Sequence, residues 1–301
     1  MRNKLLAGSV AAALTVLLTA CATPPVKPST AATEPASGEA GQTPSKAYAA
    51  AIQKGDEAFQ AQDFDRAIYH YVQALEKLPN DAITLAKIGA IEDARGNSPL
   101  AEKAFALAHA ADTQDARIAE RLARLYLRDG KVDEAGEILR AVLARDANRT
   151  RALDGMGEVS VAHSSFGEAV QYFDRALAAD KADKAAVLTH RGYAKVRLND
   201  LAGAESDFVA ALAVESREDT WRYLGDLQAR RGDSTAALES FLHVMNTAQA
   251  YNEIGVMLMS ASKFQDARDY FSKAIKASPS WFEEAAKNLA LADEHLHSAA
   301  G

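Results

Sequence analysis

The sequence predicts an all-α solenoid of about seven helical hairpins, because small and bulky apolar residues recur along it at a nearly fixed spacing. Residues 82–149 divide into two segments of 34 residues, in which Gly89 and Ala123 hold equivalent positions. An alanine recurs at steps of 30 to 35 residues, at Ala67, Ala101, Ala135, Ala169, Ala204, Ala237 and Ala267. A repeat of this length is typical of stacked helical hairpins, each of which buries its apolar face against its neighbours.

Three further positions support this register. The first helix of each hairpin carries a small residue at its eighth position: Gly55, Gly89, Ala123, Gly157, Gly192, Gly225 and Gly255. Four residues after the recurring alanine, the second helix carries a bulky residue: Tyr71, Phe105, Leu139, Phe173, Phe208, Phe241 and Phe271. Three residues further on lies a small or β-branched residue: Ala74, Ala108, Val142, Ala176, Ala211, Val244 and Ala274. Positions i, i+4 and i+7 share one helical face. We therefore expect the small residues to bring two helices close together and the bulky residue to pack against the next hairpin.

These residues resemble the tetratricopeptide repeat (TPR) family. The fullest match is Tyr251-x-x-Ile254-Gly255-x-x-Leu258, followed by Phe264-x-x-Ala267-x-x-x-Phe271-x-x-Ala274 and Pro279. The resemblance covers residues 48–281. It implies a right-handed superhelical solenoid and a protein-binding function.

The N-terminus has the layout of an export signal. Arg2 and Lys4 precede an uncharged, mostly apolar run over 5–18, which is too short for an ordinary membrane-spanning helix. The segment Leu18-Thr19-Ala20-Cys21 resembles the lipobox of bacterial lipoproteins, which implies that residues 1–20 are removed and that Cys21 carries the lipid. The alternative is an uncleaved signal anchor with an incidental cysteine.

A proline-rich segment, residues 21–45, follows the signal. It holds five of the eight prolines, among threonine, serine, alanine and glycine, a composition typical of an extended, disordered tether. By analogy with bacterial lipoproteins, Ala22 in place of an aspartate favours the periplasmic face of the outer membrane over the inner membrane. We therefore expect a lipid-anchored protein of the cell envelope.

The array itself is predicted over residues 46–298. Its hairpins are expected near 48–81, 82–115, 116–149, 150–184, 185–217, 218–247 and 248–281. The step to the seventh hairpin is only 30 residues, which predicts a tight loop near Met245–Ala248. Residues 282–298 form the expected capping helix, whose inward face would hold Phe282, Ala286, Leu289, Ala290 and Leu296.

No pattern indicates an enzyme, a cofactor or a metal site. The formal net charge of −7 disfavours nucleic acid as a partner, and a single cysteine excludes an internal disulfide framework. Ser260-x-x-Lys263 matches one string of penicillin-recognising enzymes but lacks its Lys-Thr-Gly and Ser-Asp-Asn partners. His295 and His297 lack a third ligand nearby. The remaining histidines are scattered and are interpreted as surface or packing residues: His70, His109, His163, His190 and His243.

The TPR resemblance implies a binding surface on the first helices, at positions 2, 5, 9, 12 and 13 of each hairpin. The candidate protein-binding residues at these positions are Arg117, Glu120, Arg124, Arg128, Arg151, Asp154, Glu158, Tyr193, Arg197, Arg222, Asp226 and Arg230. Arginine binds carboxylates in bidentate fashion and stacks on aromatic rings, which suits peptide recognition. The alternative is a solvated face on which these arginines pair with the acids beside them.

Signal, lipobox, proline-rich tether and TPR array, in this order, resemble the pilus-assembly lipoproteins of the Tad (Flp-type) system and the pilotins of type IV pili. The resemblance implies a non-enzymatic scaffold that holds a secretin or another pilus component. The alternative is an adaptor that brings peptidoglycan hydrolases or synthases to the outer membrane.

Overall fold

The computed structural model describes residues 45–179, 183–280 and 282–298, and every regular element in these ranges is an α-helix. The prediction of an all-α solenoid of seven hairpins and a final helix is confirmed. The helices are α2 (Lys46–Gln60), α3 (Phe64–Leu75), α4 (Ala82–Ala94), α5 (Ser98–Ala111), α6 (Ala116–Arg128), α7 (Val132–Arg145), α8 (Thr150–Ala162), α9 (Phe166–Leu177), α10 (Lys184–Arg197), α11 (Leu201–Val214), α12 (Glu218–Arg231), α13 (Ser234–Phe241), α14 (Thr247–Ser260), α15 (Phe264–Ala277) and α16 (Glu283–Ser298).

In the described part of the chain, no helix has the length and apolar character needed to cross a bilayer. The predicted signal, Cys21 and all but the last residue of the proline-rich tether lie outside the described residues.

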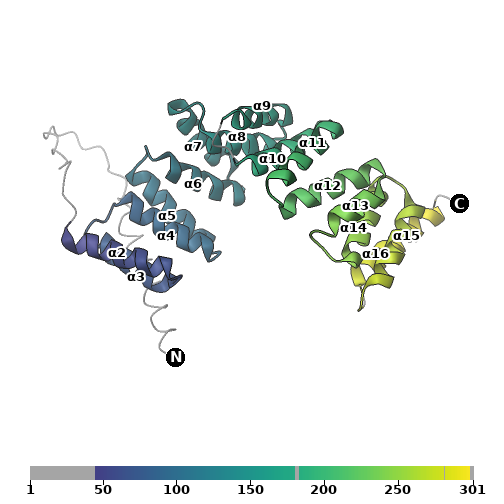
Figure 1. Ribbon diagram of the computed structural model, residues 1–301, viewed down its shortest axis with the longest axis horizontal. Coiled ribbons are helices and arrows are strands. Elements are labelled where there is room, and N and C mark those ends of the chain that lie inside the picture. The colour runs from purple at the N-terminus through teal and green to yellow at the C-terminus, as the bar shows by residue number, and fades with distance from the viewer. Residues whose placement is uncertain (1–44, 180–182, 281, 299–301) are drawn as a thin grey trace, which may run out of the picture. The chain divides into compact units, whose positions relative to one another are not determined.

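The helices form two compact units. The N-terminal unit extends to Arg145 and contains α2–α7; the C-terminal unit begins at Asp146 and contains α8–α16 (Figure 1). In the N-terminal unit each helix packs against the next one in the chain. In the C-terminal unit the first helices of successive hairpins, α8, α10, α12 and α14, also contact one another, and α14 contacts α16. First helices therefore lie beside first helices there, as in a stacked solenoid.

Every hairpin turns through the same backbone motif. One turn residue has a positive φ in each: Gln62, Gly96, Gly130, Ser164, Asn199, Gly232 and Ser262. The next residue donates its backbone N–H to the carbonyl five positions earlier, as in Asp63 to Ala58 and Ser165 to Ser160. This is the Schellman motif, which satisfies carbonyls at the end of the first helix and lets the chain reverse. The turns therefore repeat with the same register as the alanines.

The small residue at position eight lies against the bulky residue of its own hairpin. A Cβ added at Gly157 would come within 2.2 Å of the Phe173 ring, and one at Gly225 within 2.6 Å of Phe241. The other four glycines at this position contact their aromatic partners in the same way. The ring therefore does not only fill the gap to the next hairpin, as the sequence suggested; it also fits the space above the glycine. The third hairpin has Ala123 and Leu139 instead, so the added methyl group accompanies a smaller partner.

The prediction of a tight loop near Met245–Ala248 is wrong. The 30-residue step arises because α13 is short, ending at Phe241 after 8 residues. Five residues then separate α13 from α14, whereas three separate α11 from α12. Asn246 and Gln249 begin α14 with a capping box, which fixes its first residue independently of the helix before it.

The capping helix α16 begins at Glu283, and its inward face differs from the prediction. Ala285 and Ala292 are fully buried, while Ala290 is exposed. Leu289 packs against the apolar cluster around Phe271, as expected. Phe282, Ala286 and Leu296 are half-buried, so the predicted face is correct in part but misses Ala285 and Ala292.

Candidate protein-binding surfaces

A pocket of about 230 Å³ lies in the N-terminal unit between α4 and α6. Its lining residues are Ile83, Ala86, Lys87, Ala90, Phe105, Asp115, Arg117, Ile118 and Arg121. Ile83, Ala86 and Ala90 occupy positions 2, 5 and 9 of the second hairpin, the positions that face a bound chain in the TPR resemblance. Ile83 is 57% exposed, an unusual exposure for a large aliphatic side chain at the edge of a recess. We call these nine residues the α4–α6 pocket.

Cationic side chains surround this apolar floor. Arg117 is largely exposed and its Nη2 lies 2.8 Å from Asp115 Oδ2, while Arg121 is also exposed. Lys87 donates to Asp56 Oδ1 at 2.5 Å and lies 5.4 Å from the centre of the Tyr71 ring. The pocket thus combines an apolar recess with three cations, a combination that suits an apolar side chain beside a carboxylate.

Asp56 is held ionised by the same contacts. Burial acts to raise the pKa of this carboxyl group, but the hydrogen bonds from Lys87 and Tyr71 outweigh that effect and lower it below its ordinary value. Burial raises the pKa of Tyr71, and so does the hydrogen bond that its hydroxyl donates to Asp56 Oδ1 at 2.6 Å. The Asp56 carboxylate therefore lies beside the Lys87 amine next to the pocket.

The four predicted residues of the third hairpin do not form one surface. Arg117 lines the pocket and Arg124 is exposed. Glu120 is buried, with 7% of its surface exposed. Arg128 reaches across to the second hairpin, where Nη1 donates to Asp93 Oδ1 at 2.7 Å and Nη2 to Ser98 Oγ at 3.1 Å. Arg128 thus links two hairpins rather than lining the pocket.

Sequence reasoning missed the pocket because it began at the third hairpin. The same positions of the second hairpin hold Ile83, Ala86 and Ala90, so the family rule applied there would have found the floor. Lys87 and Arg121 occupy position 6, which that rule does not include.

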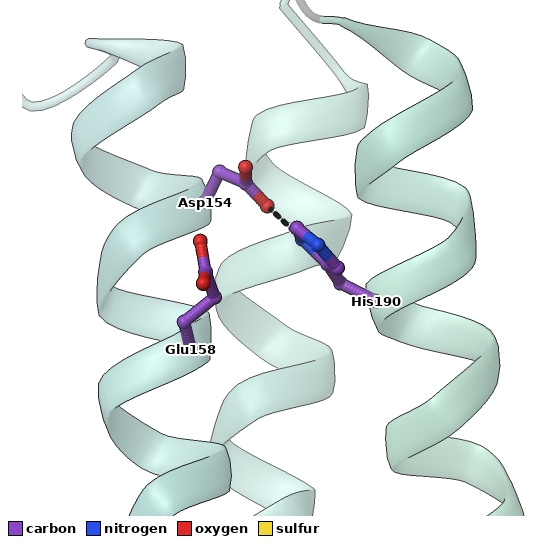
Figure 2. Close-up of side chains that lie close together, drawn as sticks. All are labelled: Asp154, Glu158 and His190. Atoms are coloured by element: carbon purple, nitrogen blue, oxygen red, sulfur yellow. Dashed lines mark hydrogen bonds and ion pairs between the residues drawn. The ribbon is translucent and has the colours of Figure 1, made fainter. Parts of the chain in front are cut away.

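In the C-terminal unit, α8 and α10 bring two predicted acids to a histidine. His190 Nδ1 lies 2.9 Å from Asp154 Oδ1, and Glu158 lies beside them (Figure 2). Burial acts to lower the pKa of His190, but the hydrogen bond with Asp154 and the negative charges of Asp154, Glu158 and Asp219 raise it above 6.5. Arg151, also predicted for this face, is exposed.

Aromatic rings follow on α10 and α12. The rings of Tyr193 and Tyr223 are 5.4 Å apart, centre to centre. Arg197 donates to the Tyr193 hydroxyl at 3.1 Å and lies 4.5 Å from the centre of the Phe166 ring. Arg197, which was predicted to bind a partner, therefore already lies over an aromatic ring of the chain itself.

The last predicted group lies on α12, where Asp226 is flanked by Arg222 and Arg230. Both arginines are exposed. Burial, and then the charge of Glu253, raise the pKa of Asp226 to about 6, although Arg230 and Arg222 act to lower it. Burial likewise raises the pKa of Glu253, with a further contribution from Glu284. The first helices α12, α14 and α16 therefore carry acids that repel one another.

The two interpretations of the predicted arginines, a peptide-binding face and a solvated face with internal pairs, both stay predictions. In the structure, Arg117 pairs with Asp115, Arg128 with Asp93 and Asp129, and Arg197 with the Tyr193 hydroxyl. The charges of Arg222 and Arg230 act on Asp226, one of the acids that the sequence suggested.

Comparison with known proteins settles the family. A tetratricopeptide repeat profile matches residues 52–116, 87–150, 120–186 and 189–243, and a second such profile matches residues 248–280. The chain belongs to the tetratricopeptide repeat family. TPR proteins are generally scaffolds that bind other proteins and have no catalytic activity of their own. No curated protein matches the chain significantly.

Solved structures share the fold at low sequence identity. A tetratricopeptide repeat protein from Parabacteroides merdae is 20% identical, with a TM-score of 0.61 over 82% of this chain and 99% of that one. PilW, described as a widely conserved type IV pilus biogenesis factor, is 19% identical, with a TM-score of 0.59 over 71% of this chain and 99% of its own. Pseudomonas aeruginosa PilF is 18% identical, with a TM-score of 0.54 over 70% and 97%.

Proposed function

We propose that this TPR protein is a lipid-anchored, non-enzymatic scaffold of the bacterial envelope that binds a component of a pilus or secretion system, of the Tad/Flp or pilotin kind. The α4–α6 pocket carries the binding part of this proposal. Its apolar floor and the cations Lys87, Arg117 and Arg121 suit a partner segment with an apolar side chain next to an acidic one.

The N-terminal layout supports the envelope location. A basic start, a short apolar run and Cys21 fit export and lipidation, and five prolines follow before the first hairpin. Stable anchoring takes more than one acyl chain, as a lipidated cysteine of this type would supply. Holding the array at a surface raises the effective concentration of the pocket for a partner on the same membrane, without new contacts.

The type of machine is suggested by two separate observations. PilW is described as a pilus biogenesis factor, and it shares this fold. A likeness of fold at this identity is compatible with many partners, so the order of signal, cysteine, tether and array carries the assignment to an envelope machine. The combination supports a pilus or secretion system as the partner machine.

Anchoring is tested by fractionation of cells that express the full chain or Cys21→Ser. We expect the wild-type protein in the outer-membrane fraction and the Cys21→Ser protein released from it. Equal membrane association of both proteins would contradict lipid anchoring.

The pilus assignment is tested with a strain that lacks the gene. We expect loss of surface pili or of secretin multimers, restored by the wild-type gene and not by one encoding the pair Arg117→Glu and Arg121→Glu. Arg140→Glu, an exposed change on α7 of the same unit, is the matched control and should restore assembly. Normal pili and normal secretin multimers in the deletion strain would exclude the pilus function, and co-purified peptidoglycan enzymes would then favour the adaptor.

A further inference from the structure

Two carboxylates and an imidazole meet between the fourth and fifth hairpins, outside the α4–α6 pocket. Asp154 and Glu158 lie on α8, and His190 lies on α10. One donor atom of each residue lies within 4.8 Å of the others. Figure 2 shows the two carboxylates on one side and the imidazole on the other, with His190 bonded to Asp154.

The spacing of one donor pair is close to that of a metal centre. Zinc bonds to nitrogen and carboxylate oxygen are about 2.0–2.2 Å long, so neighbouring ligands are about 3–3.5 Å apart. The 2.9 Å between His190 Nδ1 and Asp154 Oδ1 is close to this value. Glu158 is one helical turn beyond Asp154 on the same face of α8, and one of its carboxylate oxygens lies within 4.8 Å of the other two donor atoms.

The local charge also favours a cation. Two carboxylates at i and i+4 on a helix repel each other, and Asp219 adds its negative charge at His190. The side chains of Asp154 and His190 are 19% and 30% exposed, so they are partly desolvated but still reached by ions from solution. A cation between them would offset the repulsion and connect α8 to α10.

We propose that Asp154, Glu158 and His190 form a binding site for a divalent first-row transition metal ion, with zinc as the expected occupant. One nitrogen and two oxygen donors suit Zn²⁺, whereas Ca²⁺ and Mg²⁺ prefer oxygen alone. Three protein ligands leave a fourth tetrahedral position for water or for a group of a partner. Asp154 and His190 are 36 residues apart along the chain, because they come from neighbouring hairpins, and this is why no sequence motif revealed the site.

The inference does not depend on the proposed scaffold function, because it concerns ion binding by the isolated protein. The test is calorimetric titration of the purified, metal-free full chain with Zn²⁺, in a Cys21→Ser background that removes the single thiol. We expect one ion per chain. His190→Gln and Asp154→Asn should each weaken binding by at least about tenfold, as expected when a metal ligand is lost.

The two histidines near the C-terminus provide the control. His295 and His297 are the other histidines close to one another in the sequence. The His295 ring stacks on the Phe264 ring, with 4.6 Å between the ring centres. The double change His295→Gln and His297→Gln should leave binding intact. A folding control, the far-UV circular dichroism of each variant, should show unchanged helicity.

Binding through the ligands is tested further by Co²⁺, whose visible absorption reports nitrogen and oxygen coordination. We expect Co²⁺ bands in the wild-type protein and none in Glu158→Gln or His190→Gln. Absence of Zn²⁺ binding, or binding that survives His190→Gln and disappears with His295→Gln and His297→Gln, would overturn the proposal.

Discussion

The N-terminal and C-terminal units use the same hairpin but present different chemistry on their first helices. In the N-terminal unit, α4 and α6 surround an apolar recess with Lys87, Arg117 and Arg121. In the C-terminal unit, Asp154 and Glu158 of α8 lie beside His190, and Asp226 of α12 has a pKa of about 6 because it is buried near Glu253. The repeat constrains the glycine, the alanine and the aromatic residue of each hairpin and leaves the outer positions of the first helix free to differ.

The units also differ in how charges connect their helices. Asp207 on α11 is buried, with 4% of its surface exposed, and Arg191 and Lys195 bind its carboxylate at 2.6 and 2.8 Å. In the N-terminal unit, the pair between Arg95 and Asp65 is well exposed. Desolvated pairs are strongly sensitive to loss of one partner, and exposed pairs are not. Removing Asp207 should therefore cost much more stability than removing Asp65.

The largest effect is expected for Asp207→Ala. The change leaves Arg191 and Lys195 partly buried without their shared carboxylate, which costs about 3 kcal/mol of unfolding free energy. Asp65→Ala in the N-terminal unit should cost less than about 1 kcal/mol. Both tryptophans of the sequence lie after Arg145, the last residue of the N-terminal unit, so urea denaturation followed by tryptophan fluorescence reports the first effect and circular dichroism detects the second. Similar losses from both changes would mean that the buried pair is no stronger than the exposed one.

The next effect concerns the contact between position eight and the aromatic ring. Gly157→Ala would place a methyl group 2.2 Å from Phe173, which is fully buried, and overpacking of this kind costs about 1–3 kcal/mol. The N-terminal unit already contains the relaxed combination in Ala123 and Leu139. Phe173→Leu as a single change should lower the free energy of unfolding. We expect this loss to be smaller when Gly157→Ala is also present. A double-mutant cycle measured by urea denaturation tests this coupling, and strict additivity would contradict it.

Opposite pH dependences are expected for Asp226 and Asp56. The folded-state pKa of Asp226 is about 6, above its ordinary 3.8, so the C-terminal unit gains stability as pH falls from 7 through 6. The shift corresponds to at most about 3 kcal/mol at neutral pH, and partial exposure reduces this to about 1–2 kcal/mol. Asp226→Asn should therefore stabilise the unit by that amount at pH 7 and have no such effect below about pH 4.

Asp56 gives the opposite sign because its pKa is lowered in the folded state. Its contribution is present at neutral pH and is lost as pH falls through the carboxylate range. Asp56→Asn should destabilise the N-terminal unit at pH 7 and have little effect in acid. Circular dichroism melts of Asp226→Asn and Asp56→Asn at pH 7 and in acid measure both effects. If the melting temperatures of the two variants changed with pH in the same way, the environments assigned to Asp226 and Asp56 would be contradicted.

The smallest effect is expected at the hairpin turns. The N-terminal unit uses glycine in two of its three positive-φ turn positions, whereas the C-terminal unit has Ser164, Asn199 and Ser262 beside Gly232. Left-handed backbone is costly for residues other than glycine, and relief of this strain is partly offset by the entropy of glycine in the unfolded chain. Ser164→Gly should therefore stabilise the C-terminal unit by about 0.5–1 kcal/mol, measured by fluorescence. A loss of stability would show that the serine makes a compensating contact.

The sequence predicted the hairpins well because the backbone demands recur at a fixed interval. At Gly55 and the equivalent glycines, any side chain would clash with the aromatic ring of the same hairpin, so the spacing of these glycines revealed the helix pairs directly. The short α13 was not predicted, because Phe241 keeps its place in the register while the helix ends immediately after it. The buried face of α16 was predicted only in part, because this helix is not half of a hairpin whose pattern it must match.

The candidate sites were less predictable, for a different reason. Arg128 satisfies the positional rule for a binding face, yet its long side chain reaches Asp93 on the preceding hairpin. Ile83 carries no charge, so nothing in a search for charged clusters indicated it. The group of Asp154, Glu158 and His190 arises only when neighbouring hairpins stack.

The most direct test of partner binding by the N-terminal unit is site-specific photocrosslinking in the native cell. A photoreactive amino acid replaces Ile83 in the α4–α6 pocket or, as a control of similar exposure, Val209 on α11; the two side chains are 57% and 55% exposed. We predict one discrete adduct from position 83, identified by mass spectrometry as an envelope-machine component and lost with Arg117→Glu and Arg121→Glu, and none from position 209. The same adduct from both positions, or from position 209 alone, would contradict the account.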